Sequence, residues 1–421
     1  MKQKFVITGQ KPLVGKVTIS GSKNAALPLL CASLLANTPV ELTNVPEIQD
    51  VNTLLEIMAY LGAKIERPKN GVVRIDSSQL SAKELPHELV SRFRASILLL
   101  GPLLARFGKV KMAYPGGCVL GKRPVFAHLE ALRCLGAMIK TNHYLQLSAP
   151  ELKGQRIIMK ETSVTATENL IMAAVLAKGK TEIVLAAAEP HVQDLCRFLN
   201  KMGAKIKGSG THTLKIIGVK QLTGVKHRVI SDYLELGTFA IAAALVPQSK
   251  VSIHGGEPKD LEAFWNKFAE NGVNFTIKGK VVTVMHSPRL KPCQKLETRV
   301  HPGFPTDLQA PFSILFTQAN GVSKIFETLF EGRLGYLFEL EKMGARVEIL
   351  NPHQAIIIGP TKLRGAEVTS CDLRAGATLV LAALAAQGTS EVAQIDYIDR
   401  GYEAFEEKLK NLGAQIERVT S

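Results

Sequence analysis

Six copies of one short pattern divide the chain into units of about 70 residues. In each copy the end of a helix is followed by a glycine and then by a strand, and successive glycines lie 67 to 74 residues apart. Five of the six glycines follow Leu or Met and precede Ala. Glycine closes a helix in the left-handed backbone region without a Cβ penalty. The pattern therefore predicts six copies of one α/β unit, marked by Gly62, Gly136, Gly203, Gly272, Gly344 and Gly413.

Each copy is expected to contain a buried helix, a strand, an amphipathic helix and the strand that follows the glycine. The first helices are apolar on all sides, which indicates interior helices. They are predicted at residues 24–35, 95–105, 167–177, 236–244, 308–316 and 375–386. Amphipathic helices such as 51–61 and 402–412 are expected to cover them. Six such units favour two globular domains of three repeats over a solenoid. The alternative is an ordinary α/β protein in which the repeated Gly-Ala pairs arise by chance.

Composition favours a protein with a large core in a reducing compartment. Apolar residues make up 46% of the chain, and no apolar stretch reaches the roughly 20 residues that a bilayer needs. Near the start of the chain only three consecutive residues, Phe5 to Ile7, are apolar before a polar turn, so no secretory signal is expected. The six cysteines show no metal-ligand spacing. We therefore expect a cytoplasmic protein with no membrane segment and no metal site.

Positive charge is concentrated in one half of the chain. Residues 21–230 carry 28 Lys and Arg against 15 Asp and Glu, whereas the remaining residues carry 24 against 22. This excess favours an anionic partner. Nucleic acid is disfavoured because the chain has one Trp and seven Tyr, too few for the usual base stacking. A phosphorylated small molecule is the better interpretation, although solvated surface lysines also account for part of the excess.

Several of the buried helices begin next to a cation. Lys23, Arg94 and Arg374 lie at predicted helix starts, where backbone N–H groups and the helix dipole favour an anion. Simple N-capping explains the neighbouring Ser22, Thr306 and Asp372, but it does not explain the cations. An anionic ligand shared by several helix starts is one way to remove this conflict.

A glycine-rich segment, Pro115-Gly-Gly-Cys-Val-Leu-Gly-Lys-Arg-Pro124, carries one reactive side chain. The spacing of its glycines predicts a loop. Positive charge next to Cys118 lowers the pKa of a thiol, which makes it a usable proton donor or nucleophile. Cys31 and Cys196, in apolar surroundings, are instead expected to be buried and inert.

Together these segments resemble the UDP-N-acetylglucosamine 1-carboxyvinyltransferases, a family of enolpyruvyl transferases. The resemblance runs from Gly15 to Glu403. It rests on Gly21-Ser-Lys-Asn-Ala-Ala26, Arg94-Ala-Ser96, the Cys118 segment with Arg123-Pro-Val125, Ser163-Val164, Phe304-Pro-Thr-Asp307, Glu327-Thr328 with Arg333, Asp372-Leu-Arg-Ala375 and Ile398-Asp-Arg-Gly-Tyr-Glu403. The family fold consists of two inverse α/β barrel-like domains of three repeats each. The resemblance implies one domain at 21–230, a second at 1–20 with 231–421, and an active site in the cleft between them.

The resemblance also implies a reaction, one that requires neither a cofactor nor a metal. The enolpyruvyl group of phosphoenolpyruvate is transferred to the 3-hydroxyl of UDP-N-acetylglucosamine and phosphate is released, the first committed step of peptidoglycan precursor synthesis. Cell-wall formation, cell shape and cell division depend on this step in the family, which is the target of fosfomycin. Cys118 is then the general acid that protonates C3 of phosphoenolpyruvate, and Asp307 is the base near the sugar hydroxyl.

Other family positions carry over as substrate contacts. The residues that match phosphate-binding positions of the family are Lys23, Arg123 and Arg400, and the resemblance also makes Lys23 and Arg400 catalytic. Two further arginines, Arg333 and Arg374, match residues near the carboxylate or the leaving group. Nucleotide-sugar contacts are implied for Asn24, Arg94, Arg123, Pro124, Val125, Ser163, Val164, Asp307 and Leu329.

Four positions depart from the family pattern. Phe126 stands where an acidic residue is usual, Glu161 and Thr162 where apolar or basic residues are frequent, and Gly332 where asparagine is common. These departures are expected to affect binding of the uridine part of the nucleotide sugar. Two alternatives remain open: 5-enolpyruvylshikimate-3-phosphate synthase, which does not usually carry the Pro-Gly-Gly-Cys segment, and an RNA-end-processing protein built on the same repeat. The residues do not indicate an oligomeric state.

Overall fold

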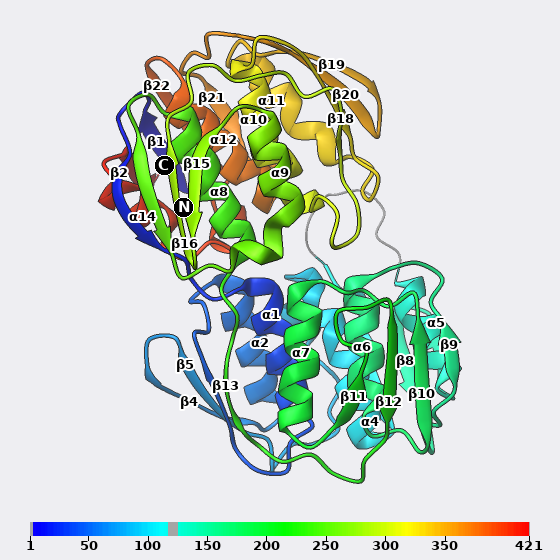
Figure 1. Cartoon of the computed structure of the whole chain (residues 1–421). Coiled ribbons are helices and arrows are strands. Elements are labelled where there is room, and N and C mark those ends of the chain that lie inside the picture. Colours follow the sequence, from blue (N-terminus) through cyan, green and yellow to red (C-terminus); the bar gives the residue numbers. More distant parts are fainter. Residues whose placement is uncertain (1–2, 117–124, 421) are drawn as a thin grey trace. The chain divides into compact units, whose positions relative to one another are not determined.

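The computed structural model describes residues 3–116 and 125–420, which form two compact units (Figure 1). Unit 1 contains residues 3–20 and 231–420, and unit 2 contains residues 21–116 and 125–230. The chain passes between the units after Ser20 and again after Ile230. Each unit has its own hydrophobic core.

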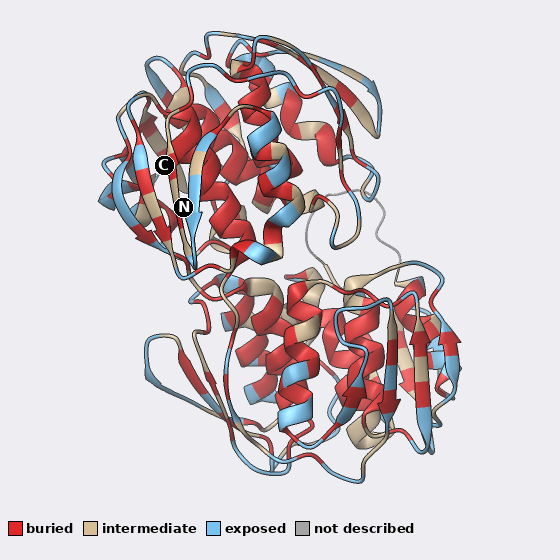
Figure 2. Ribbon diagram, in the orientation of Figure 1, coloured by how far each residue is buried: buried red, intermediate tan, exposed pale blue. Residues whose placement is uncertain are grey.

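Three buried helices form the centre of each unit (Figure 2). In unit 1 every residue of α8 (Tyr233–Leu245) is buried, and α8 packs with α10 (Gln309–Gln318) and α12 (Leu373–Ala385). In unit 2 the corresponding helices are α1 (Lys23–Ser33), η1 (Arg94–Leu99) with α4 (Leu100–Phe107), and α6 (Val164–Ala174). The all-round apolar sequence of these segments explains their interior position.

Five of the sheets formed by the described residues share one arrangement, in which a parallel pair is followed by two antiparallel partners. Unit 1 has three four-stranded sheets: β2 (Val14–Thr18), β14 (Lys250–His254), β16 (Val281–Met285) and β15 (Asn274–Lys278); β17 (Leu296–Glu297), β18 (Gly321–Phe326), β20 (Gln354–Gly359) and β19 (Arg346–Asn351); and β21 (Glu367–Thr369), β22 (Thr389–Ala393), β1 (Gln3–Thr8) and β23 (Gln415–Thr420).

Two sheets of unit 2 repeat this order, whereas the described strands of the third form only antiparallel pairs. Its sheets are β13 (Lys226–Arg228), β3 (Val40–Thr43), β5 (Val72–Asp76) and β4 (Lys64–Lys69); β9 (Arg156–Ile158), β10 (Lys180–Val184), β12 (Thr213–Ile217) and β11 (Lys205–Lys207); and the three described strands β6 (Lys109–Ala113), β8 (Tyr144–Ser148) and β7 (Met138–Thr141).

The six repeat glycines do what the sequence predicts. Each has a positive φ, between 78° and 108°. Each is followed by a strand at the edge of its sheet, namely β4, β7, β11, β15, β19 and β23. The six-copy α/β prediction is confirmed, and β1 completes the last copy by pairing with both β22 and β23.

Six amphipathic helices lie outside the central ones. They are α2 (Gln49–Tyr60), α5 (Phe126–Cys134), α7 (Pro190–Lys201), α9 (Glu262–Glu270), α11 (Tyr336–Lys342) and α14 (Phe405–Asn411). Shorter elements are α3 (His87–Val90), η2 (Pro258–Leu261), η3 (Thr306–Leu308), η4 (Arg333–Gly335) and α13 (Asp396–Asp399). In the described part of the chain, no helix has both the length and the apolar character that crossing a membrane requires.

Two predicted helices differ from those observed. The helix predicted at 95–105 begins as 3₁₀ helix η1, and Pro102, which has no N–H, cannot donate to the Leu98 carbonyl in an α-helical turn. The helix predicted at 402–412 starts only at Phe405, because Ala404 has a left-handed φ of 48°. The other central helices differ from prediction by one to three residues at each end.

Candidate functional site

Asp307 lies between two buried arginines in unit 1. Arg333 Nη1 donates to Asp307 Oδ1 at 2.9 Å, and Arg374 Nε donates to Asp307 Oδ2 at 3.2 Å. The two arginine side chains are each 4% exposed, whereas the Asp307 side chain is 26% exposed. The structure therefore brings three of the predicted site residues together, with the carboxylate at the open end.

Local packing positions this group. Phe304 is buried against the ring of Phe312, 5.2 Å away between centroids, which anchors the chain just before Asp307. Asp372 caps α12 by accepting from the backbone N–H groups of Arg374 and Ala375 at 2.7 and 3.0 Å. The predicted N-cap at Asp372 is thus confirmed.

The two arginines retain donors beyond those bound to Asp307. Arg333 Nε and Arg374 Nη1 are buried and have no hydrogen-bond partner among the described residues. Burial lowers the pKa of Arg333, but the charges of Asp307, Asp372 and Glu327 together raise it above its usual value. Burial also lowers the pKa of Arg374, and its net pKa is nevertheless raised by Tyr402, Asp307 and Asp232. Both guanidinium groups are therefore charged.

Thr306 does not cap a helix. Its hydroxyl donates to Glu327 Oε2 at 2.8 Å and accepts from Arg333 Nη1 at 2.9 Å, and the N-cap position of η3 is Pro305. The N-cap prediction for Thr306 is therefore wrong, because a buried carboxylate competes for its hydroxyl. Leu329, 39% exposed, follows two residues after Glu327 and donates its N–H to that carboxylate at 3.0 Å.

Arg400 directly follows α13 in unit 1. Arg418 donates to both oxygens of Asp399 at 2.8 Å and to Glu406 at 2.6 Å, so it ties together the two sides of the segment that carries Arg400. Gly376 in α12 leaves room for Ile398, since a Cβ there would lie 2.7 Å from Ile398 Cγ1. This close approach sets α13 against the helix of Arg374.

Lys23 and Asn24 form the first turn of α1 in unit 2. Ser22 caps the helix, as predicted, by accepting from Ala25 N at 3.4 Å. Lys23 Nζ lies 2.6 Å from Asp50 Oδ2, and both side chains are largely buried. Sequence reasoning missed Asp50, although an acid in the first turn of α2 was the available signal.

Elements of unit 2 that meet at His128 carry four more candidate residues: Arg94, Val125, Ser163 and Val164. Arg94 begins η1, Val125 precedes α5, and Ser163 precedes α6, whose first residue is Val164. Asn169 Nδ2 donates to His128 Nδ1 at 2.8 Å, and His128 Nε2 lies 3.1 Å from Thr165 Oγ1. Burial, and then the charge of Arg94, lower the pKa of His128 to about 3, so its ring is neutral.

Cys118, Arg123 and Pro124 lie outside the described residues, so their assignments stay predictions. Cys31 and Cys196 are buried as predicted, and burial raises the pKa of the Cys31 thiol well above its usual range and that of Cys196 to about 12.

The departures from the family pattern lie at the surface. Phe126 is 54% exposed at the start of α5, and Glu161 is exposed just before α6. Gly332 has a φ of 75°, a conformation that asparagine also tolerates.

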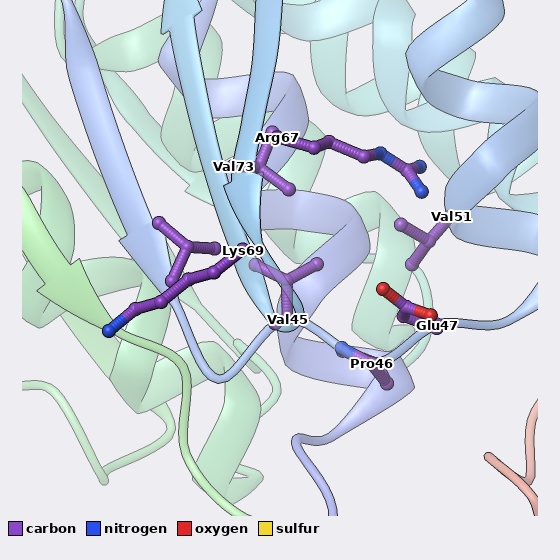
Figure 3. Close-up of a pocket in the computed structure, with 9 residues that line it drawn as sticks. Val45, Pro46, Glu47, Val51, Arg67, Lys69 and Val73 are labelled. Atoms are coloured by element: carbon purple, nitrogen blue, oxygen red, sulfur yellow. The ribbon is translucent and has the colours of Figure 1, made fainter.

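One small pocket lies in unit 2 between the β4–β5 hairpin and the start of α2, with about 220 Å³ of open space. Figure 3 shows the Arg67 and Glu47 side chains directed to one side of it, whereas Lys69 points away. None of the described candidate residues lines it. Within residues 3–116 and 125–420, no group of three His, Cys, Asp or Glu side chains is placed to hold a metal ion.

Known proteins resemble the chain over its whole length. The sequence model of the EPSP synthase (3-phosphoshikimate 1-carboxyvinyltransferase) family matches residues 7–409. UDP-N-acetylglucosamine 1-carboxyvinyltransferase 2 of Carboxydothermus hydrogenoformans is 46% identical over 99% of this chain and 100% of its own length. The UDP-N-acetylglucosamine 1-carboxyvinyltransferase of Hydrogenovibrio crunogenus is 47% identical over 99% of both chains.

Solved structures are similar in fold. The enolpyruvyl transferase NikO from Streptomyces tendae matches with a TM-score of 0.91 and 26% identity, covering 100% of this chain and 99% of its own. EPSP synthase from Acinetobacter baumannii matches with a TM-score of 0.76 and 21% identity over the full length of both chains, which supports the fold alone.

Proposed function

Because the chain belongs to the EPSP synthase family of enolpyruvyl transferases, we propose that it transfers the enolpyruvyl group of phosphoenolpyruvate to the 3-hydroxyl of UDP-N-acetylglucosamine, releasing phosphate. The full-length identity of 46–47% to enzymes with that activity in their names carries this proposal. The EPSP synthase alternative is weaker, since the structures of that enzyme share only 21–22% identity with this chain. The proposed role is the first committed step of peptidoglycan precursor synthesis, in the cytoplasm.

The chemistry assigns separate tasks to the candidate residues. Cys118 donates a proton to C3 of phosphoenolpyruvate, which makes C2 electrophilic. The sugar 3-hydroxyl attacks C2 and gives its proton to Asp307. Loss of phosphate from C2 and return of a proton from C3 to the Cys118 thiolate then restore the vinyl group, and the proton held by Asp307 leaves with the phosphate. Asp307 belongs to unit 1, and Cys118 lies outside the described part of the chain.

The surroundings of Asp307 support its role. Arg333 and Arg374 hold the carboxylate in its charged, proton-accepting form and orient both of its oxygens. The unpartnered Arg333 Nε and Arg374 Nη1 are available to a substrate carboxylate or a departing phosphate. Lys23, Arg123 and Arg400 are proposed to bind the phosphate group. Asn24, Arg94, Pro124, Val125, Ser163, Val164 and Leu329 are proposed to bind the nucleotide sugar.

The test is phosphate release from phosphoenolpyruvate with each of two acceptors. We expect turnover with UDP-N-acetylglucosamine and none with shikimate 3-phosphate. Asp307→Asn should lower kcat by about 10²- to 10⁴-fold, the usual contribution of a general base. Asp396→Asn, at an exposed acid of unit 1, is the matched control and should leave kcat unchanged.

Each of the other outcomes would indicate a different class of protein. Turnover with shikimate 3-phosphate alone would identify the second enolpyruvyl transferase. No turnover with either acceptor, together with tight and salt-dependent RNA binding, would favour the nucleic-acid alternative.

A further inference from the structure

Glu327 is a fully buried carboxylate at the end of β18 that contacts two segments of the candidate site. Its Oε1 accepts from Thr298 Oγ1 and Leu329 N at 3.0 Å each, and from Phe330 N at 3.2 Å. Its Oε2 accepts from Thr306 Oγ1 at 2.8 Å. All four partners donate, which matches an ionised acid, a group that can only accept.

Thr306 connects this carboxylate to Asp307. A guanidinium group can only donate, so the 2.9 Å contact between Arg333 Nη1 and Thr306 Oγ1 makes the hydroxyl an acceptor there. The Thr306 proton therefore points to Glu327. The same Arg333 nitrogen also donates to Asp307 Oδ1 at 2.9 Å. A continuous chain of hydrogen bonds thus joins Asp307 to Glu327: Arg333 donates to both Asp307 and Thr306, and Thr306 donates on to Glu327.

The surroundings of Arg333 fix its side chain on both sides. Arg333 is nearly buried, its ring neighbour is Phe330 at 4.9 Å from the guanidinium carbon, and the Phe330 N–H is itself bound by Glu327. Moving Glu327 would therefore disturb both sides of Arg333. Asp307, which is held by Arg333 on one oxygen, would lose its orientation in turn.

We propose that Glu327 is a positioning residue for proton transfer by Asp307, acting through the Thr306 hydroxyl and Arg333. This inference rests on the proposed role of Asp307 as the base. Glu327 touches no substrate in this proposal. It fixes the direction in which the Thr306 proton points, and thereby the place of Arg333 and of the Asp307 carboxylate.

Two substitutions break the chain at different links. Glu327→Gln places an NH₂ group on one side of the amide, so either Thr306 or the three donors at the other oxygen lose their acceptor. Thr306→Val removes the hydroxyl without altering any charge. Each should lower kcat about ten- to a hundredfold, the scale of a misplaced catalytic group, with both KM values within about threefold of wild type.

Three comparisons separate positioning from general destabilisation. Thr306→Ser keeps the hydroxyl and should restore kcat to within about threefold of wild type. The double variant should be no slower than the slower single variant, because both act on one chain of bonds. Thr317→Val removes another buried hydroxyl of unit 1, one that bonds only within and beside α10, and should leave kcat unchanged.

A readout independent of activity completes the test. The ¹⁵N NMR signals of the Arg333 guanidinium, assigned with Arg333→Lys, should shift in Thr306→Val and stay near wild type in Thr306→Ser. Unchanged Arg333 signals, additive losses in the double variant, or a Thr306→Val enzyme with wild-type kcat would overturn the positioning role. A wild-type protein inactive with both acceptors, whose Arg333 signals still respond to Thr306→Val, would refute the proposed function while leaving the chain of hydrogen bonds intact.

Discussion

Lys23 Nζ lies 2.6 Å from Asp50 Oδ2, which pairs a cation at the start of α1 with a carboxylate at the start of α2. The helix dipole disfavours a cation at this end, and the sequence suggested an anionic ligand as its counter-charge. The structure supplies a carboxylate of the same unit. Arg374, at the start of α12, is paired with Asp307 in the same way.

Asp50→Asn should destabilise unit 2, because it leaves the Lys23 ammonium group at a helix start without this carboxylate. Removing one partner of a buried ion pair costs on the order of 3 kcal/mol. Thermal unfolding measures the loss, and added inorganic phosphate should raise the Tm of the variant more than that of wild type. Glu66→Gln breaks an exposed lysine pair and should change stability by less than about 1 kcal/mol. An Asp50→Asn protein as stable as wild type would contradict the importance of this pair.

Short-range signals were readable from the sequence, and long-range pairs were not. The repeat glycines, the apolar helices and the caps at Ser22 and Asp372 each depend on residues within a few positions. The bonds of Lys23 to Asp50, Arg374 to Asp307 and Thr306 to Glu327 join residues 21 to 67 positions apart. The repeat pattern carries no information about such long-range contacts. The resemblance identified some of the residues involved, but not which of them bond to each other. The left-handed Ala404 was equally invisible, since alanine normally favours a helix.

Glu168→Gln should remove a pH-dependent loss of stability in unit 2. Glu168 is fully buried in α6, and burial, followed by the charge of Glu189, raises its pKa well above the usual value of 4.5. The folded state thus holds a proton that the unfolded state releases above about pH 4.5. The contribution of Glu168 to the free energy of unfolding is therefore fully present below about pH 4.5. It is lost as the pH rises toward the pKa of Glu168 in the folded protein.

The difference in unfolding free energy between Glu168→Gln and wild type should therefore grow with pH, by up to about 1.4 kcal/mol per pH unit. Urea unfolding followed by circular dichroism from pH 5 to pH 8 gives the comparison. Glu161→Gln, at an exposed position before the same helix, should show no such trend. A difference that stays constant across this range would mean that Glu168 is ionised in the folded protein.

Cys118 should be the site at which a phosphonate epoxide such as fosfomycin inactivates the enzyme, because cations flank its thiol in the sequence. Mass spectrometry of the inhibited protein should find the adduct there and not on Cys134 or Cys371, the exposed cysteines of the described part. Cys118→Ser should lose activity. Cys118→Asp should retain appreciable activity at acid pH and lose sensitivity, because a carboxylic acid can still donate the proton. An adduct on another cysteine, or a fully active Cys118→Ser, would refute the assignment.

Phe126→Asp should lower the KM for UDP-N-acetylglucosamine. By the resemblance, Phe126 stands where an acidic residue is usual, and our hypothesis is that such an acid accepts a hydrogen bond from the uridine end of the substrate. One such bond is worth roughly 0.5 to 1.5 kcal/mol, or about three- to tenfold in affinity. Because the lost contact contributes equally to ground state and transition state, kcat and the KM for phosphoenolpyruvate should remain unchanged.

The position of Phe126 makes this substitution a fair test. The side chain is 54% exposed at the first residue of α5, so its replacement opens no cavity in the core. An acid in the first turn of a helix is also favoured by the dipole, by about 0.3 to 1 kcal/mol, and the variant should be at least as stable as wild type. Met138→Asp replaces another exposed apolar residue of unit 2 and should leave the acceptor KM unchanged. An unaltered KM would mean that the residue at position 126 does not contact this acceptor, and a raised KM would mean that the aromatic ring itself contacts it. In either case the nucleotide contact proposed beside Val125 must be withdrawn.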